Sequence, residues 1–121
     1  MNIALWIVSG ILAAAYLTAG VMKSLRSKES LQPNLPWVAD FSAGTVRLIG
    51  VAELLGAIGL ILPWATDIAR VLTPLAAVGL VVIQALAIPV HLRRNEPKAL
   101  AANLPLLVAA AFVAIGRFAT L

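Results

Sequence analysis

Four apolar runs of roughly twenty residues each divide this chain, and they restrict its fold more than any other feature. The runs cover residues 3–22, 45–63, 71–90 and 99–117. A helix rises about 1.5 Å per residue, so each run spans about 30 Å as a helix, which is the thickness of a bilayer core. Backbone polar groups in lipid must be paired within the chain, which favours helices. The sequence therefore predicts an all-α fold, a four-helix transmembrane bundle that forms a single domain over residues 1–121.

The composition supports a membrane protein and excludes several kinds of chemistry. Hydrophobic residues make up 62% of the chain and charged residues only 12%, whereas a soluble domain is about half apolar and about a quarter charged. The chain has no cysteine, which excludes disulfides, thiolate nucleophiles and cysteine-ligated iron–sulfur clusters. A single histidine is weak support for a metal site, so we expect none. The net charge of +4 does not form a basic patch with interleaved aromatics, so we expect no nucleic-acid partner.

The segments between the runs predict where the chain leaves the membrane. The first six residues, MNIALW, contain no basic residue, so we expect the first run to be retained rather than cleaved as a signal peptide. Residues 23–40 carry charges and two prolines and are predicted to form the longest loop, with Trp37 at the headgroup level. Pro63 is expected to close the second run, and Pro89 to mark a kink or an end of the third.

The basic residues predict an orientation. With four spans, the loop over residues 23–40 and the loop over residues 91–98 lie on one side of the membrane, together with most of the cationic side chains. These are Lys23, Arg26, Lys28, Arg47, Arg93, Arg94 and Lys98, against Arg70 and Arg117 on the other side. The richer side is expected to be cytoplasmic, which places both termini outside. We expect Arg93, Arg94 and Lys98 to serve as topology markers that contact lipid headgroups or a partner.

Glu53 is the main candidate for a functional residue, because a carboxylate inside a membrane span costs free energy and usually has a role. We predict Lys23 as its ionic partner, with Tyr16 seven residues earlier on the same helix face. Arg47 lies about 240° around the helix from Glu53, so their direct pairing requires the arginine to bend. The alternative is that Glu53 only fixes helix register, either in an ion pair or as a hydrogen-bonded neutral acid.

Further polar residues are expected in the same half of the membrane. Gln84 and His91 are seven residues apart and share one stripe of the third helix, and Asn103 lies at a similar depth in the fourth. The candidate ligand or proton-relay residues are Glu53, Lys23, Tyr16, Arg47, Gln84, His91 and Asn103. Gln84 and Asn103 also fit the ordinary role of hydrogen bonding between helices. For His91 we favour an interfacial residue in a basic turn.

Several motifs resemble the DoxX-like integral membrane proteins. In order they are AYLTAGVMK, VRLIGVAELLGAIGLILP, LTPLAAVGL, HLRRNEPKALAANLPLL and a closing GRF. The order and spacing of Lys23, Arg47, Glu53, Pro63, Pro74, His91 and Arg93 make the resemblance fairly specific. It implies a four-helix membrane protein of a group named for a subunit of a thiosulfate:quinone oxidoreductase, with some members linked to redox or stress processes. It also implies the bacterial inner membrane.

Three functions are compatible with these residues. The first is a membrane subunit or anchor with a lipid or quinone pocket around Glu53 and a soluble redox partner at the cytoplasmic loops. If a quinone binds, Glu53, Tyr16 and His91 are the residues that would handle its protons. The second is a small proton-coupled transporter that uses Glu53, and the third is a membrane-protein assembly factor. We expect no enzymatic activity from the chain by itself, and a homo-oligomer would supply a larger shared pocket.

Overall fold

The computed structural model describes residues 2–33 and 35–121. Within these residues there are four long helices and no strand. The long helices are α1 (Asn2–Leu25), α3 (Ala43–Thr66), α4 (Leu72–Arg93) and α5 (Pro97–Ala119), and the short elements are α2 (Lys28–Leu31) and the 3-10 helix η1 (Pro36–Asp40). Each long helix has the length and composition needed to cross a membrane. The predicted all-α, four-helix bundle is therefore confirmed.

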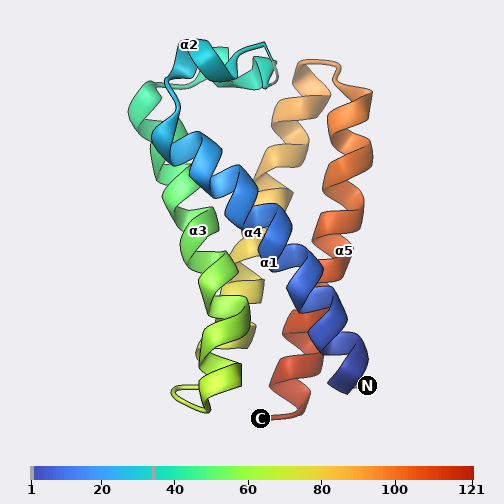
Figure 1. The fold of residues 1–121 in the computed structure, drawn as a ribbon. Coiled ribbons are helices and arrows are strands. Elements are labelled where there is room, and N and C mark those ends of the chain that lie inside the picture. Colours follow the sequence, from blue (N-terminus) through green and yellow to red (C-terminus); the bar gives the residue numbers. More distant parts are fainter. Residues whose placement is uncertain (1, 34) are drawn as a thin grey trace.

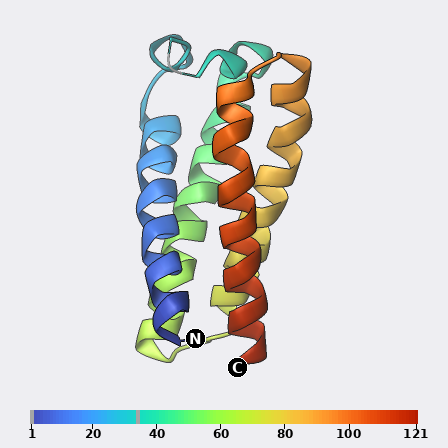
Figure 2. The ribbon, with the colours of Figure 1, turned by 90° about the vertical axis from the view of Figure 1, so that its right-hand side faces the viewer.

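The long helices run side by side and give the bundle two distinct ends (Figure 1). One end carries α2, η1 and the turn between α4 and α5, and is called the basic end. The other carries both chain termini and the turn between α3 and α4, and is called the terminal end (Figure 2). The polar loops thus lie at the ends of the bundle, where water and headgroups can solvate them.

Helix α1 crosses the bundle, passing from α5 at the terminal end to α3 at the basic end (Figure 1). Two glycines allow the close approach to α3. A Cβ on Gly20 would lie 2.7 Å from the carbonyl oxygen of Gly50, and a Cβ on Gly50 would lie 2.7 Å from the Lys23 Cβ. At the terminal end, Leu5 packs against Gly116 of α5. Because of this crossing, α1 and α5 are separated at the basic end.

The expected helix end at Pro63 is wrong, and so is an end at Pro89, because both prolines lie inside longer helices. The kink expected as the alternative at Pro89 stays a prediction. A proline cannot donate a hydrogen bond to the carbonyl four residues earlier, so Pro63 leaves the Gly59 carbonyl without its helical partner. The Thr73 hydroxyl of α4 donates a hydrogen bond of 2.8 Å to that carbonyl. The neighbouring helix therefore compensates for the proline. Lys23, which was expected to begin the loop, belongs to α1.

The long loop folds into a small cap over the basic end. Ser27 begins α2 by accepting a hydrogen bond from the Ser30 amide, and Ser42 begins α3 in the same way with the Thr45 amide. Between them, buried Leu31 and Val38 pack on Val46 of α3 and form a second, smaller core. Serine at these positions satisfies an amide that the helix leaves unpaired. The cap is therefore ordered by its own apolar contacts.

The main core is small, and the outer surface is apolar. Buried residues from the long helices meet along the bundle axis, and they are Leu12, Tyr16, Ala57, Leu60, Ala77, Leu80, Ala110, Val113 and Ala114. Large apolar side chains also point outward, among them Ile3, Ile7, Ile11, Leu48, Leu55, Leu62, Leu86, Val108 and Ile115. An exposed apolar surface of this extent is suited to acyl chains. The chain is therefore an integral membrane protein.

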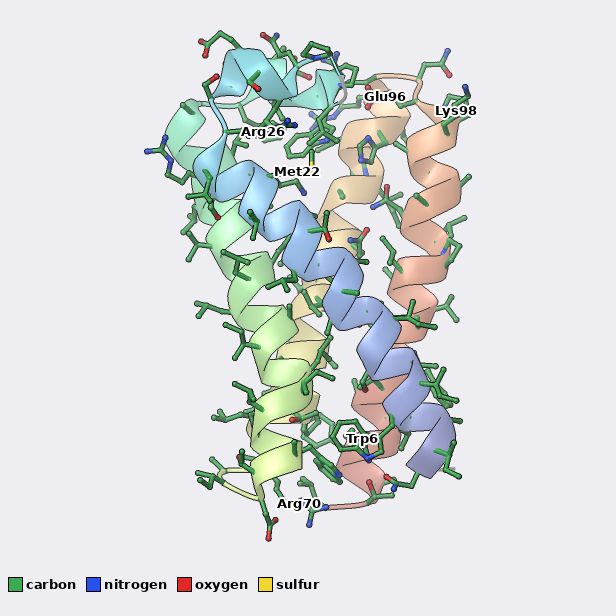
Figure 3. The ribbon with its side chains drawn as sticks, viewed as in Figure 1. Trp6, Met22, Arg26, Arg70, Glu96 and Lys98 are labelled. Carbon is green, nitrogen blue, oxygen red and sulfur yellow. The ribbon has the colours of Figure 1, made fainter. Side chains whose placement is uncertain are left out.

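The terminal end is closed by a buried arginine. Arg117 is only 1% exposed, and its guanidinium carbon lies 5.2 Å from the Trp6 ring centroid and 4.4 Å from that of Trp64. It donates a hydrogen bond of 2.9 Å to the Asn2 side chain. Arg70 stacks on Trp64 at 3.9 Å, and Figure 3 shows Trp6 and Arg70 together at this end. Cations over indole rings are stabilised by the ring quadrupole, so this cluster joins α1, α3 and α5.

Candidate functional site

A cavity of about 680 Å³ lies toward the basic end, in the space that the crossing of α1 opens between α1 and α5. Its apolar wall is formed mainly by alanine, leucine and proline. Its polar lining includes six of the seven predicted candidate residues, namely Tyr16, Lys23, Glu53, Gln84, His91 and Asn103. These side chains come from α1, α3, α4 and α5. A smaller cavity of about 300 Å³ adjoins it on the side of α3 and α4 and shares Lys23 and Glu53.

The predicted pairing of Lys23 with Glu53 is confirmed. The Lys23 Nζ lies 2.7 Å from the Glu53 Oε1, and their side chains are 13% and 3% exposed. The close contact of α1 with α3 at Gly20 and Gly50 holds the two side chains at this distance. Because the opposite charges neutralise each other, the pair adds no net charge to the cavity wall. The chain itself therefore supplies a cationic partner for Glu53.

A chain of hydrogen bonds crosses the cavity floor from α5 to α1. The Asn103 amide donates to the Gln84 side-chain oxygen, and the Gln84 Nε2 donates to the Tyr16 hydroxyl oxygen over 2.7 Å. The Tyr16 oxygen thus accepts a hydrogen bond and its own proton remains to be donated. The predicted role of Gln84 and Asn103 in joining helices is confirmed by these contacts. The same contacts orient Tyr16 as a donor at the cavity.

His91 was expected as an interfacial residue in a basic turn. It lies in the last turn of α4, where its side chain is buried. The distance from the His91 Nδ1 to the Glu96 Oε1 is 2.8 Å. The turn after α4 explains this contact. Asn95 has a φ of 55°, and the amides of Glu96 and Asn95 donate to the carbonyls of His91 and Leu92. This is the Schellman pattern, which brings the second residue after the helix cap back over the last turn. Local backbone geometry therefore places Glu96 against His91.

Trp37 and Glu96 line the cavity although the sequence did not indicate either as a site residue. The Trp37 ring is 5.3 Å from the Lys23 Nζ and packs edge-on at 6.4 Å against the His91 ring. Trp37 therefore covers the cavity from the cap rather than pointing only at headgroups. The signal for Glu96 was present in the sequence, since asparagine followed by a proline two residues later is typical of this helix ending. Nothing local indicated Trp37.

Of the remaining predicted residues, Lys98 lines the cavity, and Arg47, Arg93 and Arg94 do not. Arg47 and Arg93 are exposed, so Arg47 is separate from the cavity that holds Glu53. Arg94 donates a hydrogen bond of 2.8 Å to Asp40 of η1, which raises the pKa of the Arg94 guanidinium. Arg94 also lies 3.4 Å from Glu96, so it fastens the cap to the turn. Lys98 lines the cavity at its rim, and Figure 3 shows it near Glu96 at the basic end.

Residues 2–33 and 35–121 contain no cluster of three histidine, aspartate or glutamate side chains placed to hold a metal ion. The donors at the cavity are instead an ammonium, amides, a phenol and an imidazole. These groups form hydrogen bonds with oxygen atoms of an organic ligand. The cavity is therefore suited to a small organic molecule.

Fold and cavity together define a small multi-pass helical membrane protein with a largely apolar cavity that holds a few polar groups near one end. The model of the DoxX-like family matches residues 7–113, which include every residue described above as polar lining of the cavity. The chain therefore belongs to the DoxX-like family. No curated protein and no solved structure gives a significant match to the chain.

Proposed function

We propose that this protein is a membrane subunit or anchor that binds a lipid-soluble molecule, a lipid or a quinone, in the cavity around Glu53. The observation that supports the proposal most strongly is the convergence of Tyr16, Lys23, Glu53, Gln84 and Asn103 on one cavity of about 680 Å³. These residues come from all four long helices, and polar side chains in a membrane interior are costly without a role.

The cavity has the size and lining that such a ligand needs. Small-molecule sites usually have about 300–1,000 Å³, with apolar walls and a few polar groups that orient the ligand. Here the walls are apolar, and Lys23 and Tyr16 supply hydrogen-bond donors. A quinone has two carbonyl oxygens and an apolar ring, so these residues fit it. When bound, a quinone would supply electron-transfer chemistry that the side chains themselves lack.

A soluble partner is proposed at the basic end. Arg26, Arg47, Arg93 and Lys98 are exposed there, whereas Arg94 is engaged by Asp40 and Glu96. A cationic surface attracts an acidic one and speeds its association. Family membership supports a link to redox or stress processes, so we propose an acidic redox protein as the partner.

The transporter alternative has less support. A proton-coupled exporter needs a carboxylate that loses its counterion during the cycle, whereas Lys23 lies 2.7 Å from Glu53. That ammonium also opposes the approach of a cationic substrate. The assembly-factor alternative predicts only a structural role for the pair.

The first test is to purify the protein in mild detergent and identify co-purifying lipids by mass spectrometry. We expect a quinone or another lipid at a reproducible ratio to protein, and its loss from Glu53→Gln and Gln84→Leu. Matched controls are Glu29→Gln and Gln32→Leu, since both residues are exposed and lie outside the cavity lining. The controls should retain the ligand.

The same proteins separate the three functions. Wild-type protein without any bound lipid or quinone would contradict the proposal. Proton flux in liposomes that depends on Glu53 and on an added substrate would favour the transporter. A loss of thermal stability in Glu53→Gln, with no ligand found in the wild type or in any variant, would favour the assembly factor.

A further inference from the structure

We infer that the cavity takes its ligand sideways from the bilayer, through an alanine-lined opening between α1 and α5, and selects a neutral head that accepts hydrogen bonds. This inference rests on the proposed function, and it adds the direction of access and the chemistry of the ligand.

The opening is formed by small side chains on both helices. Ala15 and Ala19 of α1 and Ala99 and Ala102 of α5 line the cavity, and Ala15 and Ala102 are exposed on the surface of the bundle. Figure 1 shows α1 and α5 apart over this length, before they converge toward the terminal end. Methyl groups leave room for an apolar tail, and a membrane would place acyl chains at this height. The opening therefore faces lipid.

Two polar groups of the cavity, Tyr16 and Gln84, lie well below the headgroups, whereas Lys23 is near the end of α1. Tyr16 is nine residues before the end of α1 at Leu25, and Gln84 is nine residues before the end of α4 at Arg93. Nine residues correspond to about 14 Å of helix. A charged headgroup is costly at this depth. The Lys23–Glu53 pair is already neutral as a whole, so it provides no unmatched charge for an ionic ligand.

The hydrogen-bond pattern indicates that the ligand head is an acceptor. Gln84 donates to the Tyr16 oxygen, so the Tyr16 proton remains free for a ligand. The Lys23 ammonium has three protons, and one of them is directed at Glu53. A carbonyl oxygen suits both donors. A neutral quinone with an apolar tail satisfies the donors, the depth of Tyr16 and the opening, whereas a phosphate at the depth of Tyr16 would carry an uncompensated charge.

The test measures quenching of Trp37 fluorescence in lipid nanodiscs, since Trp37 lines the cavity. The probes are a benzoquinone with a decyl tail, the same ring without the tail, and decyl phosphate as a charged competitor. Trp37→Phe identifies the part of the quenching that comes from the cavity. Phenylalanine replaces Ala15 or Ala102 to narrow the opening. The matched controls are Ala14→Phe and Ala101→Phe, which alter exposed neighbours outside the lining.

We expect quenching by the tailed quinone to develop at least about tenfold more slowly in Ala15→Phe and Ala102→Phe than in the control variants, because a narrowed entrance slows ligand entry. Decyl phosphate should fail to compete at a tenfold excess. Equal quenching rates in all phenylalanine variants would overturn the lateral opening and leave the proposed pocket intact. Effective competition by decyl phosphate would overturn the preference for a neutral head. No quenching of wild-type Trp37 by either quinone would overturn the inference together with quinone binding.

Discussion

At the scale of single residues, Lys23 and Glu53 differ in their burial and in their distance from a helix end. Glu53 is in the middle of α3 with its side chain 3% exposed, whereas Lys23 is near the end of α1 and is 13% exposed. A lysine close to a helix end can extend its ammonium toward the headgroups, but a carboxylate in the middle of a helix has no such path. The two single substitutions should therefore have different effects.

Lys23→Met is expected to lower the free energy of unfolding by about 3–5 kcal/mol, because it leaves a buried carboxylate without a counterion. Glu53→Gln should lower the free energy of unfolding by less, since the Lys23 ammonium that it leaves without a partner can reach water. The Lys23→Met/Glu53→Gln double variant should be more stable than Lys23→Met alone. Thermal unfolding in detergent measures all three, and additive losses would show that the two residues are not energetically coupled.

Prolines inside the long helices matter at the scale of elements, since each removes one backbone hydrogen bond. For Pro63, the freed carbonyl of Gly59 is satisfied by Thr73 from the next helix. One hydroxyl thus repairs α3 and also fixes the position of α4 beside it. This contact lies close to the turn that joins the two helices.

Thr73→Val is expected to destabilise the protein by about 1–3 kcal/mol, because the half-buried Gly59 carbonyl is left unpaired. Pro63→Ala restores the helical donor to the same carbonyl. In the Pro63→Ala protein, Thr73→Val should therefore lower the free energy of unfolding much less than in the wild type. Chemical unfolding of the four proteins of this cycle measures the difference, and an equal cost in both backgrounds would contradict the assigned role of Thr73.

Glycine contacts between α1 and α3 support a second prediction at this scale. Gly20→Ala should force the helices apart and cost about 1–3 kcal/mol, because the new Cβ would meet the Gly50 carbonyl at 2.7 Å. Gly10→Ala is the control, since its Cβ would have nothing within 4 Å. It should be neutral or slightly stabilising. The melting temperatures of Gly20→Ala and Gly10→Ala test this prediction. Similar melting temperatures would argue against a tight contact between α1 and α3.

At the scale of the whole molecule, the two ends of the bundle differ in chemistry. The cavity, the cap and most basic residues share the basic end, while the terminal end holds Arg117 between two tryptophans. The cavity is lined by residues of one chain and is open between α1 and α5. We propose that the basic end faces the cytoplasm of a bacterium, because cationic loops are retained on that side of the inner membrane.

This orientation predicts the accessibility of introduced cysteines, which is easily measured because the chain has none. Ser30→Cys in α2 and Ile68→Cys in the α3–α4 turn both replace exposed residues. A membrane-impermeant maleimide applied to intact cells should label Ile68→Cys and spare Ser30→Cys. Labelling of both after permeabilisation is the control. The reverse pattern in intact cells would invert the proposed topology.

The polar residues of the cavity show how much of the candidate site could be predicted from the sequence. Six of the seven candidate residues line it, because a polar side chain within a long apolar run is conspicuous and its depth follows from helix geometry. Arg47 was included by its closeness to Glu53 in sequence, but it is exposed on another face of α3. Trp37 was missed because it lies in a connecting segment, whose course depends on the elements that it joins. Glu96 was missed although the helix ending around Asn95 indicated its position.

The apolar runs by themselves determined the class of fold, since lipid leaves the backbone few alternatives to helices. The spacing of Tyr16 and Lys23 also determined that both lie on one face of α1. Only the tertiary structure decided that α1 crosses from α5 to α3 and leaves a cavity at one end. That outcome depends on which glycines and leucines meet across helices, and such contacts join residues far apart in sequence. A pattern read along one helix contains no information about them.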